Sequence, residues 1–308
     1  MSMCRAATTR LFSAAVSKRG SNAVSLLPSY MTAPKPESKL PLINTSIAEN
    51  RCSSRQLTSK INELYKSQTF TPDMIYYQPT HGTESCRKAF KSLFEQILCP
   101  NYPFDPDKIT LSAGCNAALE ILIGAITEPG QTILVPTPVY ATFGFDLGAR
   151  SLNPIVTVDP AYPTNPDFTD PSTYYPSIEK LSAYCDALPP SSHPPVLLLT
   201  NPSNPLGITF PPSVLASLLT FAHSRGMHVV SDEIYAGSIH SSTNDFTSVA
   251  TVAKDLYGSM GTHTHIVYSV SKDFSLSGLR AGAVYSENEE ANKALQKVND
   301  LCQVSGAE

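Results

Sequence analysis

Four clusters of polar residues lie directly after apolar segments, and they contain the side chains of this sequence that could do chemistry. The clusters are SAGCN (112–116), TNPSNPLG (200–207), SDEIY (231–235) and SVSKDF (269–274). A lysine amine can act as a nucleophile or general base, and a carboxylate that follows an apolar strand needs a cationic partner. The Gly, Asn, Pro, Ser and Asp residues of these clusters are also ordinary turn residues. Four clusters in equivalent positions nevertheless indicate one shared small-molecule site.

The elements that would position these clusters alternate along the chain from residue 109 onward. Strands are expected at 109–113, 133–136, 152–158, 196–200, 227–232 and 265–269, and helices at 116–126, 176–187 and 211–225. Near-continuous apolar strands separated by helices are typical of a mainly parallel sheet with helices on both faces. The predicted fold class is therefore α/β. In such sheets, ligands bind beyond the carboxyl ends of the strands, where the four clusters lie.

The composition and charge of the chain limit the kinds of molecule that it is expected to bind. The chain has 308 residues, 42% of them hydrophobic, and a formal net charge of −4. No segment approaches the roughly 18 consecutive apolar residues of a membrane span, and the charge offers no basic footprint for nucleic acid. We therefore expect a small-molecule partner, no membrane and no nucleic acid. The histidines show no spacing with cysteines or acids that predicts a metal site, so no metal is expected.

Three motifs, in this order and spacing, carry a family resemblance. TNPSNPLG, VVSDEIYAG (229–237) and HIVYSVSKDFSLSGLRAGAVYS (265–286) resemble the class I and II pyridoxal-phosphate-dependent aminotransferases, which have fold type I. Within that superfamily they are most similar to the aminocyclopropane-carboxylate synthases and their fungal relatives. The resemblance runs from about residue 48 to the chain end. It implies pyridoxal 5′-phosphate as the cofactor, an α-amino acid as the substrate, and a homodimer.

The resemblance assigns catalytic roles to three residues. Lys272 would hold the cofactor as an aldimine and later move the α-proton of the substrate. Asp232 would keep the pyridine nitrogen protonated, which makes the ring an electron sink. Tyr235 would share the phenolic oxygen of the cofactor with Asn204, although Asn204 can also be read as a turn residue between two prolines. Glu233 receives no catalytic role.

The resemblance also assigns residues to the phosphate and to the ring face of the cofactor. Ser269 and Arg280 would bind the phosphate through a hydroxyl and a guanidinium group. The backbone at a helix N-terminus would wrap around the same phosphate, at Gly114, Cys115 and Asn116. Tyr140, in the segment PTPVYATF (136–143), would stack on the pyridine ring, and its alternative is a core tyrosine.

Two N-terminal segments bear on the substrate. SIAEN (46–50) resembles a synthase segment that contributes an active-site glutamate, so Glu49 is a substrate-site candidate. Thr80 stands where those synthases have a tyrosine that reaches into the neighbouring subunit's site, and this departure weakens the synthase interpretation. Tyr76 or Tyr77 are alternatives for that tyrosine from shifted positions.

The motif positions also suggest how the chain is divided. Residues 1–36 are expected to be a flexible basic arm, with a mitochondrial presequence as the alternative. Residues 37–75 would be the N-terminal segment of the small domain, at the substrate edge. Residues 76–308 would be the large cofactor-binding domain, truncated before the small C-terminal domain of the family. The seven cysteines show no CxxC and no pairing by spacing, which favours reduced thiols and a cytoplasmic protein.

Three functions follow from these features. The first is transamination of an α-amino acid through a Lys272 aldimine. The second is an aminocyclopropane-carboxylate synthase-like lyase that acts on S-adenosylmethionine, favoured by Glu49 and disfavoured by Thr80. The third is an inactive, truncated protein that binds the cofactor without turnover.

Overall fold

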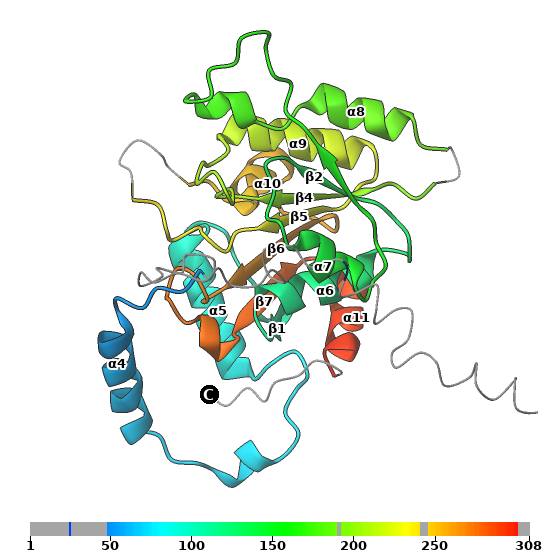
Figure 1. Ribbon diagram of the computed structural model, residues 1–308. Coiled ribbons are helices and arrows are strands. Elements are labelled where there is room, and N and C mark those ends of the chain that lie inside the picture. Colours follow the sequence, from blue (N-terminus) through cyan, green and yellow to red (C-terminus); the bar gives the residue numbers. More distant parts are fainter. Residues whose placement is uncertain (1–24, 26–47, 190–191, 241–245, 301–308) are drawn as a thin grey trace, which may run out of the picture.

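The protein is represented by a computed structural model that describes residue 25 and residues 48–189, 192–240 and 246–300. The predicted arm over 1–36 therefore lies outside the described residues, except for residue 25. The described chain forms a seven-stranded sheet in the order β1-β7-β6-β5-β4-β2-β3 (Figure 1). The strands are β1 (Ile109–Ser112), β2 (Ile133–Pro136), β3 (Ile155–Val158), β4 (Val196–Thr200), β5 (Val229–Asp232), β6 (Thr264–Ser269) and β7 (Gly282–Ser286).

The sheet is mainly parallel, as predicted. Strands β3, β2, β4, β5 and β6 pair in parallel, and β7 pairs antiparallel with both β6 and β1. Because β1 and β6 both oppose β7, the carboxyl ends of β1 and β6 lie at the same edge of the sheet. All the strands that precede the polar clusters therefore end at one edge, which is where a parallel α/β sheet binds its ligand.

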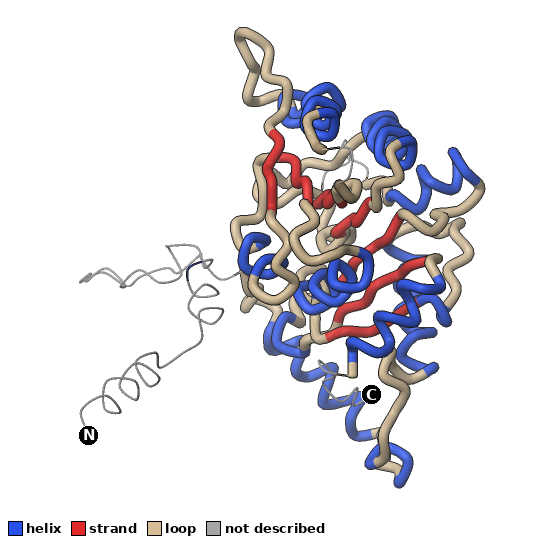
Figure 2. Tube along the Cα trace, turned by 90° about the vertical axis from the view of Figure 1, so that its right-hand side faces the viewer, coloured by secondary structure: helices blue, strands red, loops and turns tan. Residues whose placement is uncertain are grey.

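Helices cover both faces of the sheet, and Figure 2 shows them on either side of the strands. The helices are α4 (Ser54–Lys66), α5 (Glu84–Ile97), α6 (Cys115–Ile126), α7 (Phe143–Gly148), α8 (Ile178–Asp186), α9 (Pro212–Ser224), α10 (Val249–Tyr257) and α11 (Glu289–Asn299). Short 3₁₀ turns form at η1 (Pro72–Ile75), η2 (Pro106–Lys108), η3 (Pro171–Tyr174) and η4 (Ser277–Leu279). The predicted α/β class with helices on both faces is confirmed.

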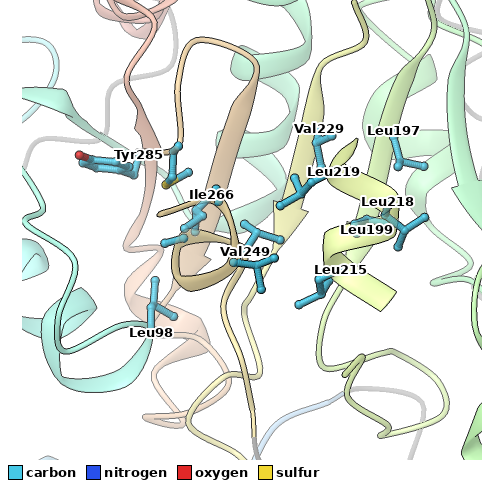
Figure 3. Packing of buried hydrophobic residues seen from close by; sticks show 14 of the residues in the cluster. Leu98, Leu197, Leu199, Leu215, Leu218, Leu219, Val229, Val249, Ile266 and Tyr285 are labelled. Atoms are coloured by element: carbon cyan, nitrogen blue, oxygen red, sulfur yellow. The ribbon is translucent and has the colours of Figure 1, made fainter. Parts of the chain in front are cut away.

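Two apolar cores follow from the alternation of side chains along the strands. Leu197 and Leu199 of β4 pack into a core with α5, α8, α9 and α10, part of which is drawn in Figure 3. Val196 and Leu198 of the same strand pack into a second core with α6, α7 and α11. The near-continuous apolar sequence of β4 thus results from burial on both faces.

Two strand predictions need correction. The strand predicted over 152–158 begins only at Ile155, because Leu152 has a positive φ of 63° and Pro154 has no N–H to offer a neighbouring strand. The strand predicted over 227–232 begins at Val229. Strand β7 and the helices α4, α5, α7 and α10 were not among the predicted elements, although β7 lies between β1 and β6 in the sheet.

The described N-terminal segment extends away from the sheet (Figure 1). Helix α4 contains no buried residue. Phe70, Ile75, Tyr76 and Tyr77 are also exposed, Tyr77 fully so. The apolar side chains of this segment therefore have little of this chain to pack against. Of the helices in the described ranges, none is both long and apolar enough to cross a membrane.

Candidate functional site

The carboxyl edge of the sheet brings the polar clusters into contact. The thiol Sγ of Cys115, at the start of α6, lies 3.4 Å from Oδ1 of Asp232, at the end of β5. The Nδ2 of Asn204, after β4, donates to the hydroxyl of Tyr235 at 3.2 Å. The Nη2 of Arg280, after β6, donates to the carbonyl of Ala113 at 3.0 Å. Turns that are far apart in the sequence therefore form one site.

Asp232 is the buried acid of this site. Its side chain is 6% exposed, and its Oδ1 also accepts from the backbone N of Ile234 at 3.2 Å. Burial raises the pKa of Asp232 to about 6, although the hydrogen bonds from Cys115 and Ile234 act to lower it. Both donors are neutral. A ligand that brought a positive charge to Asp232 would therefore stabilise its ionised form.

The thiol of Cys115 stays protonated. Its burial, followed by the charge of Asp232, raises the pKa of Cys115 well above its ordinary value. The neutral thiol can thus donate to Asp232, a contact that the sequence did not reveal. The five cysteines in the described part of the chain are all free, in line with the prediction of reduced thiols.

Glu233 follows Asp232 in the chain and is fully buried. Its Oε1 accepts from the hydroxyl of Ser231 at 3.0 Å and from the backbone N of Val249 at 2.9 Å, while its Oε2 has no hydrogen-bond partner. Burial raises the pKa of Glu233 to about 7. The carboxyl group links β5 to the first turn of α10, which is a structural role.

This buried carboxyl predicts a pH-dependent stability difference. The folded pKa of Glu233 lies above its unfolded value of 4.5, so folding is favoured by protonation and opposed by ionisation. Glu233→Gln mimics the neutral acid. Its free energy of unfolding should therefore exceed that of the wild type by about 3 kcal/mol at about pH 8. The difference should shrink as the pH falls through 7 and vanish below 4.5.

Urea unfolding of both proteins across this pH range measures the difference. The exposed Glu179, in the first turn of α8, provides the control Glu179→Gln, which should show no such pH dependence. A Glu233→Gln protein that is less stable than the wild type at high pH would contradict the assigned cause, because the ionised carboxylate would then be the stabilising form.

Lys272 lies in the loop that follows β6 and is half-buried. Its Nζ donates to the carbonyl of Ala48 at 3.2 Å. Burial is the largest cause that lowers the pKa of Lys272, and the positive charge of Arg280 lowers it further, while Cys115, Asp232 and Glu49 act in the opposite direction. A larger share of the amine is therefore neutral, and a neutral amine is the nucleophilic form.

Tyr235 and Tyr140 are the two predicted tyrosines of the site. Burial is the largest cause that raises the pKa of Tyr235, and Asp232 and Tyr140 add to it. The hydroxyl of Tyr235 accepts from Asn204 and so can still donate its own proton to a ligand. The ring of Tyr140 packs edge-on against Phe143 at 5.3 Å between centroids. Tyr140 is therefore partly a core residue, as its alternative interpretation proposed, and it also lies close enough to Tyr235 to affect it.

The N-terminus of α6 forms a cradle with Arg280. Gly114 precedes this helix with a φ of 89°, and a Cβ at Gly114 would lie 2.2 Å from Nη2 of Arg280. A Cβ at Gly282 would lie 2.7 Å from the carbonyl carbon of Gly114. Both glycines thus permit a close approach of the two segments. The first turn of α6 contains no acidic residue, so a guanidinium group and a positive helix end lie side by side.

We expect Gly114→Ala to displace Arg280. The new methyl group would overlap the guanidinium group, so affinity for a phosphate-bearing cofactor should fall roughly 10-fold to 100-fold, the value of a charge-assisted hydrogen bond. Gly130→Ala is the matched control, because Gly130 has a similar φ of 84° but a Cβ there would meet nothing within 4 Å. Equilibrium titration with pyridoxal 5′-phosphate measures both. Equal affinities for the two variants would contradict the cradle.

Two of the predicted phosphate residues make other contacts. The hydroxyl of Ser269 is fully buried and donates to the carbonyl of Ala281 at 2.8 Å, next to the hydroxyl of Ser271 at 2.7 Å. The side chain of Asn116 forms a hydrogen bond with Asp146 of α7. Only the backbone of Asn116, at the start of α6, is thus left to bind a phosphate. Their predicted contacts with a phosphate remain predictions.

The N-terminal candidates separate into two groups. Glu49 is close enough to act on the pKa of Lys272, although it also pairs with Arg51 at 2.9 Å. Thr80 donates to the carbonyl of Gln296 at 2.7 Å and so packs against α11. Tyr76 is exposed. Within the described chain, the structure thus brings Glu49 to the site, whereas Thr80 faces another helix.

The donor set fits the cofactor that the motifs imply. A phosphorylated pyridine aldehyde needs an anion cradle, an acid for its ring nitrogen and an amine for its aldehyde. The guanidinium of Arg280 and the N-terminus of α6 together provide the first, Asp232 the second and Lys272 the third. The main evidence for this fit is the close approach of Arg280 to Gly114, where a Cβ would collide with the guanidinium. This approach places the guanidinium and the positive N-terminus of α6 together, as an anion requires.

Comparisons with known proteins show the family of the chain. The family described as "Aminotransferase class I and II" matches residues 43–307. The chain is 38% identical over 232 residues to 1-aminocyclopropane-1-carboxylate synthase 7 of Arabidopsis thaliana, covering 74% of this chain and 50% of that protein. It is 34% identical over 276 residues to 1-aminocyclopropane-1-carboxylate synthase 3 of Oryza sativa subsp. japonica, covering 86% and 59%. The chain thus spans little more than half the length of these curated relatives.

Solved structures share the fold. The aspartate aminotransferase of Thermotoga maritima superposes with a TM-score of 0.66 at 19% identity, over 93% of this chain and 70% of that chain. The aromatic aminotransferase of Pyrococcus horikoshii superposes with the same TM-score of 0.66 at 19% identity, over 91% and 65%. At this identity the likeness establishes the fold alone, and the family is established by the sequence match. The chain therefore belongs to the class I and II aminotransferases, whose cofactor is pyridoxal 5′-phosphate, as the motifs predicted.

Proposed function

We propose that this chain binds pyridoxal 5′-phosphate and serves transamination of an α-amino acid. The observation that carries the proposal is the arrangement of Lys272, Asp232 and the Gly114–Arg280 cradle around one edge of the sheet. When bound, the cofactor supplies an aldehyde for the substrate amine and a ring that takes up electrons from the α-carbon. This chain's residues must hold the cofactor, keep its ring charged and move the proton.

Each residue then has a physical task. Lys272 would hold the cofactor through its amine, and the same amine could take a proton from the α-carbon of the substrate and return it elsewhere. Asp232, ionised above a pH of about 6, would hold a proton on the ring nitrogen. Tyr235 and Asn204 would donate to the phenolic oxygen. Arg280 and the helix start would bind the phosphate, and Tyr140 would lie against the ring.

A lyase that acts on S-adenosylmethionine is the second candidate. The curated relatives above, at 38% and 34% identity, are named as aminocyclopropane-carboxylate synthases. The electrostatic influence of Glu49 on Lys272 favours this candidate, because Glu49 is the residue that the synthase resemblance assigns to the substrate. Thr80 disfavours this candidate, because it stands where the synthases have a tyrosine and its hydroxyl donates to α11.

Assembly and compartment are proposed on the same basis. We propose a homodimer, supported by the exposed apolar side chains that follow α4. The division at residues 37–75 and 76–308 remains a proposal. For the compartment, the free thiols of the described cysteines favour the cytoplasm, with the mitochondrion as the alternative if the basic arm acts as a presequence.

One assay separates the candidates. The purified chain is incubated with pyridoxal 5′-phosphate and then with amino acids or with S-adenosylmethionine. Keto-acid formation from an amino acid supports transamination, and release of methylthioadenosine supports the lyase. A cofactor absorbance band that no substrate perturbs would support the third function, cofactor binding without turnover. A chain that develops no such band would contradict the proposal as a whole.

A further inference from the structure

Asp273 follows Lys272 directly, and its carboxylate is the acceptor for three hydrogen bonds. Its Oδ2 accepts from the backbone N of Gly237 at 2.8 Å and from the hydroxyl of Tyr268 at 2.7 Å. Its Oδ1 accepts from the hydroxyl of Ser238 at 2.5 Å. We propose that Asp273 is a positioning residue, which fixes the loop that carries Lys272 against the loop that follows Asp232.

The loop after β5 is shaped to receive this carboxylate. A Cβ at Gly237 would lie 2.9 Å from Oδ2 of Asp273, so the absence of a side chain at Gly237 allows the two loops to approach. The backbone N of Ser238 donates to the carbonyl of Tyr235 at 2.9 Å. The two groups that bind Asp273 from this loop are therefore held in one turn with Tyr235, which is itself a proposed cofactor residue.

The third donor anchors the contact in the core. Tyr268 is a fully buried residue of β6, and its ring packs edge-on against Phe94 at 5.9 Å between centroids. Burial, together with the charge of Asp273, raises the pKa of Tyr268 well above its ordinary value. The hydroxyl therefore keeps its proton and stays a donor. The carboxylate of Asp273 is thus bound from a rigid strand on one side and from the Tyr235 turn on the other.

This geometry has a consequence for Lys272. A catalytic amine must be held within about 0.5 Å of its productive position, and a residue adjacent in the chain can do this through the backbone. Asp273 accepts from Gly237, Ser238 and Tyr268, and the amine of Lys272 donates to Ala48 instead, so Asp273 would act through its neighbour. The catalytic meaning of this inference rests on the proposed function, whereas the coupling of the two loops does not.

Two substitutions separate positioning from charge. Asp273→Ala removes all three hydrogen bonds. Asp273→Asn can keep them, because its carbonyl oxygen can replace Oδ2 and its NH₂ can donate to the hydroxyl of Ser238, which is also able to accept. Asp255→Ala, at an exposed position of α10, is the control for loss of an aspartate.

The first measurement uses the full chain without cofactor. Hydrogen exchange is followed in the segments 233–240 and 268–276. We expect both segments of Asp273→Ala to exchange roughly 10-fold to 100-fold faster than in the wild type, the value of losing hydrogen bonds to a charged group. Asp273→Asn should restore most of the protection, and Asp255→Ala should not change it.

The second measurement uses pyridoxal 5′-phosphate. In Asp273→Ala, the dissociation constant should rise about 10-fold or more, and the pH midpoint of the bound cofactor's absorbance should shift, because the amine is displaced from the ring. A merely structural role would lower the melting temperature and leave this midpoint in place. That outcome, or unchanged exchange in Asp273→Ala, or an Asp273→Asn protein as impaired as Asp273→Ala, would overturn the proposal. If the wild type binds no cofactor, the proposed function fails, and the exchange comparison still decides whether Asp273 couples the loops.

Discussion

Lys272→Ala is expected to lower the rate of any amino-acid turnover by this chain roughly 10⁴-fold or more. The substitution removes both the nucleophile that attaches the cofactor and the base that moves the α-proton, and a general base alone contributes typically about 10²–10⁴. The pKa of Lys272 is lowered by burial and by Arg280, so the wild-type amine is poised for both tasks. Single-turnover absorbance after mixing the cofactor-loaded chain with an amino acid measures this rate.

Lys272→Arg is the matched control for charge. Arginine keeps the cation next to Arg280 and Asp232, but its guanidinium does not deprotonate in proteins. Lys272→Arg should therefore be as slow as Lys272→Ala, even if it binds the cofactor more tightly. A rate within tenfold of the wild type in either variant would show that another group performs the chemistry.

Asp232→Asn should have the second largest effect. Asparagine has the same shape and can still accept from the backbone N of Ile234, but it carries no charge for a ring nitrogen. Removing one partner of a buried ion pair costs about 3–5 kcal/mol, which corresponds to roughly 10²–10³-fold or more in cofactor affinity or rate. Asp232→Glu keeps the charge and tests whether its position also matters.

The pH dependence of the wild type should have the same origin. The folded pKa of Asp232 is raised to about 6 from 3.8, so the carboxylate is charged above this value and is lost as a counter-ion below it. Cofactor affinity of the wild type should thus weaken as the pH falls through 6, and that of Asp232→Asn should not show this step. Titrations at several pH values measure it, and a step that persists in Asp232→Asn would assign it to another group.

The parallel part of the fold was predictable because its strands are buried on both faces. β4 was predicted with its correct bounds, since its first four residues, VLLL, are apolar and the strand ends at a proline-rich turn. β7 was not, because GAVYS is short, and its place depends on pairing with β1, far away in the sequence. α10 did carry local signals, an N-cap at Ser248 and a left-handed glycine at Gly258, which the reading of apolar periodicity passed over.

The site was predictable in its residue types and less so in its contacts. The sequence placed Asp232 and Lys272 after neighbouring strands, and the structure has them after β5 and β6, whereas Arg280, which was assigned by the resemblance, lies just before β7. The contact of the Cys115 thiol with Asp232 and the three hydrogen bonds to Asp273 were not predictable. Both depend on how turns from different strands meet, and no local pattern in the sequence reports that.

Chemical trapping tests the central claim most directly. The full chain is mixed with pyridoxal 5′-phosphate, reduced with borohydride to make any link between the cofactor and an amine permanent, and digested for mass spectrometry. We expect the phosphopyridoxyl group on Lys272, and Gly114→Ala should reduce its yield whereas Gly130→Ala should not. A label spread over exposed lysines with none on Lys272, or no label at all, would contradict it.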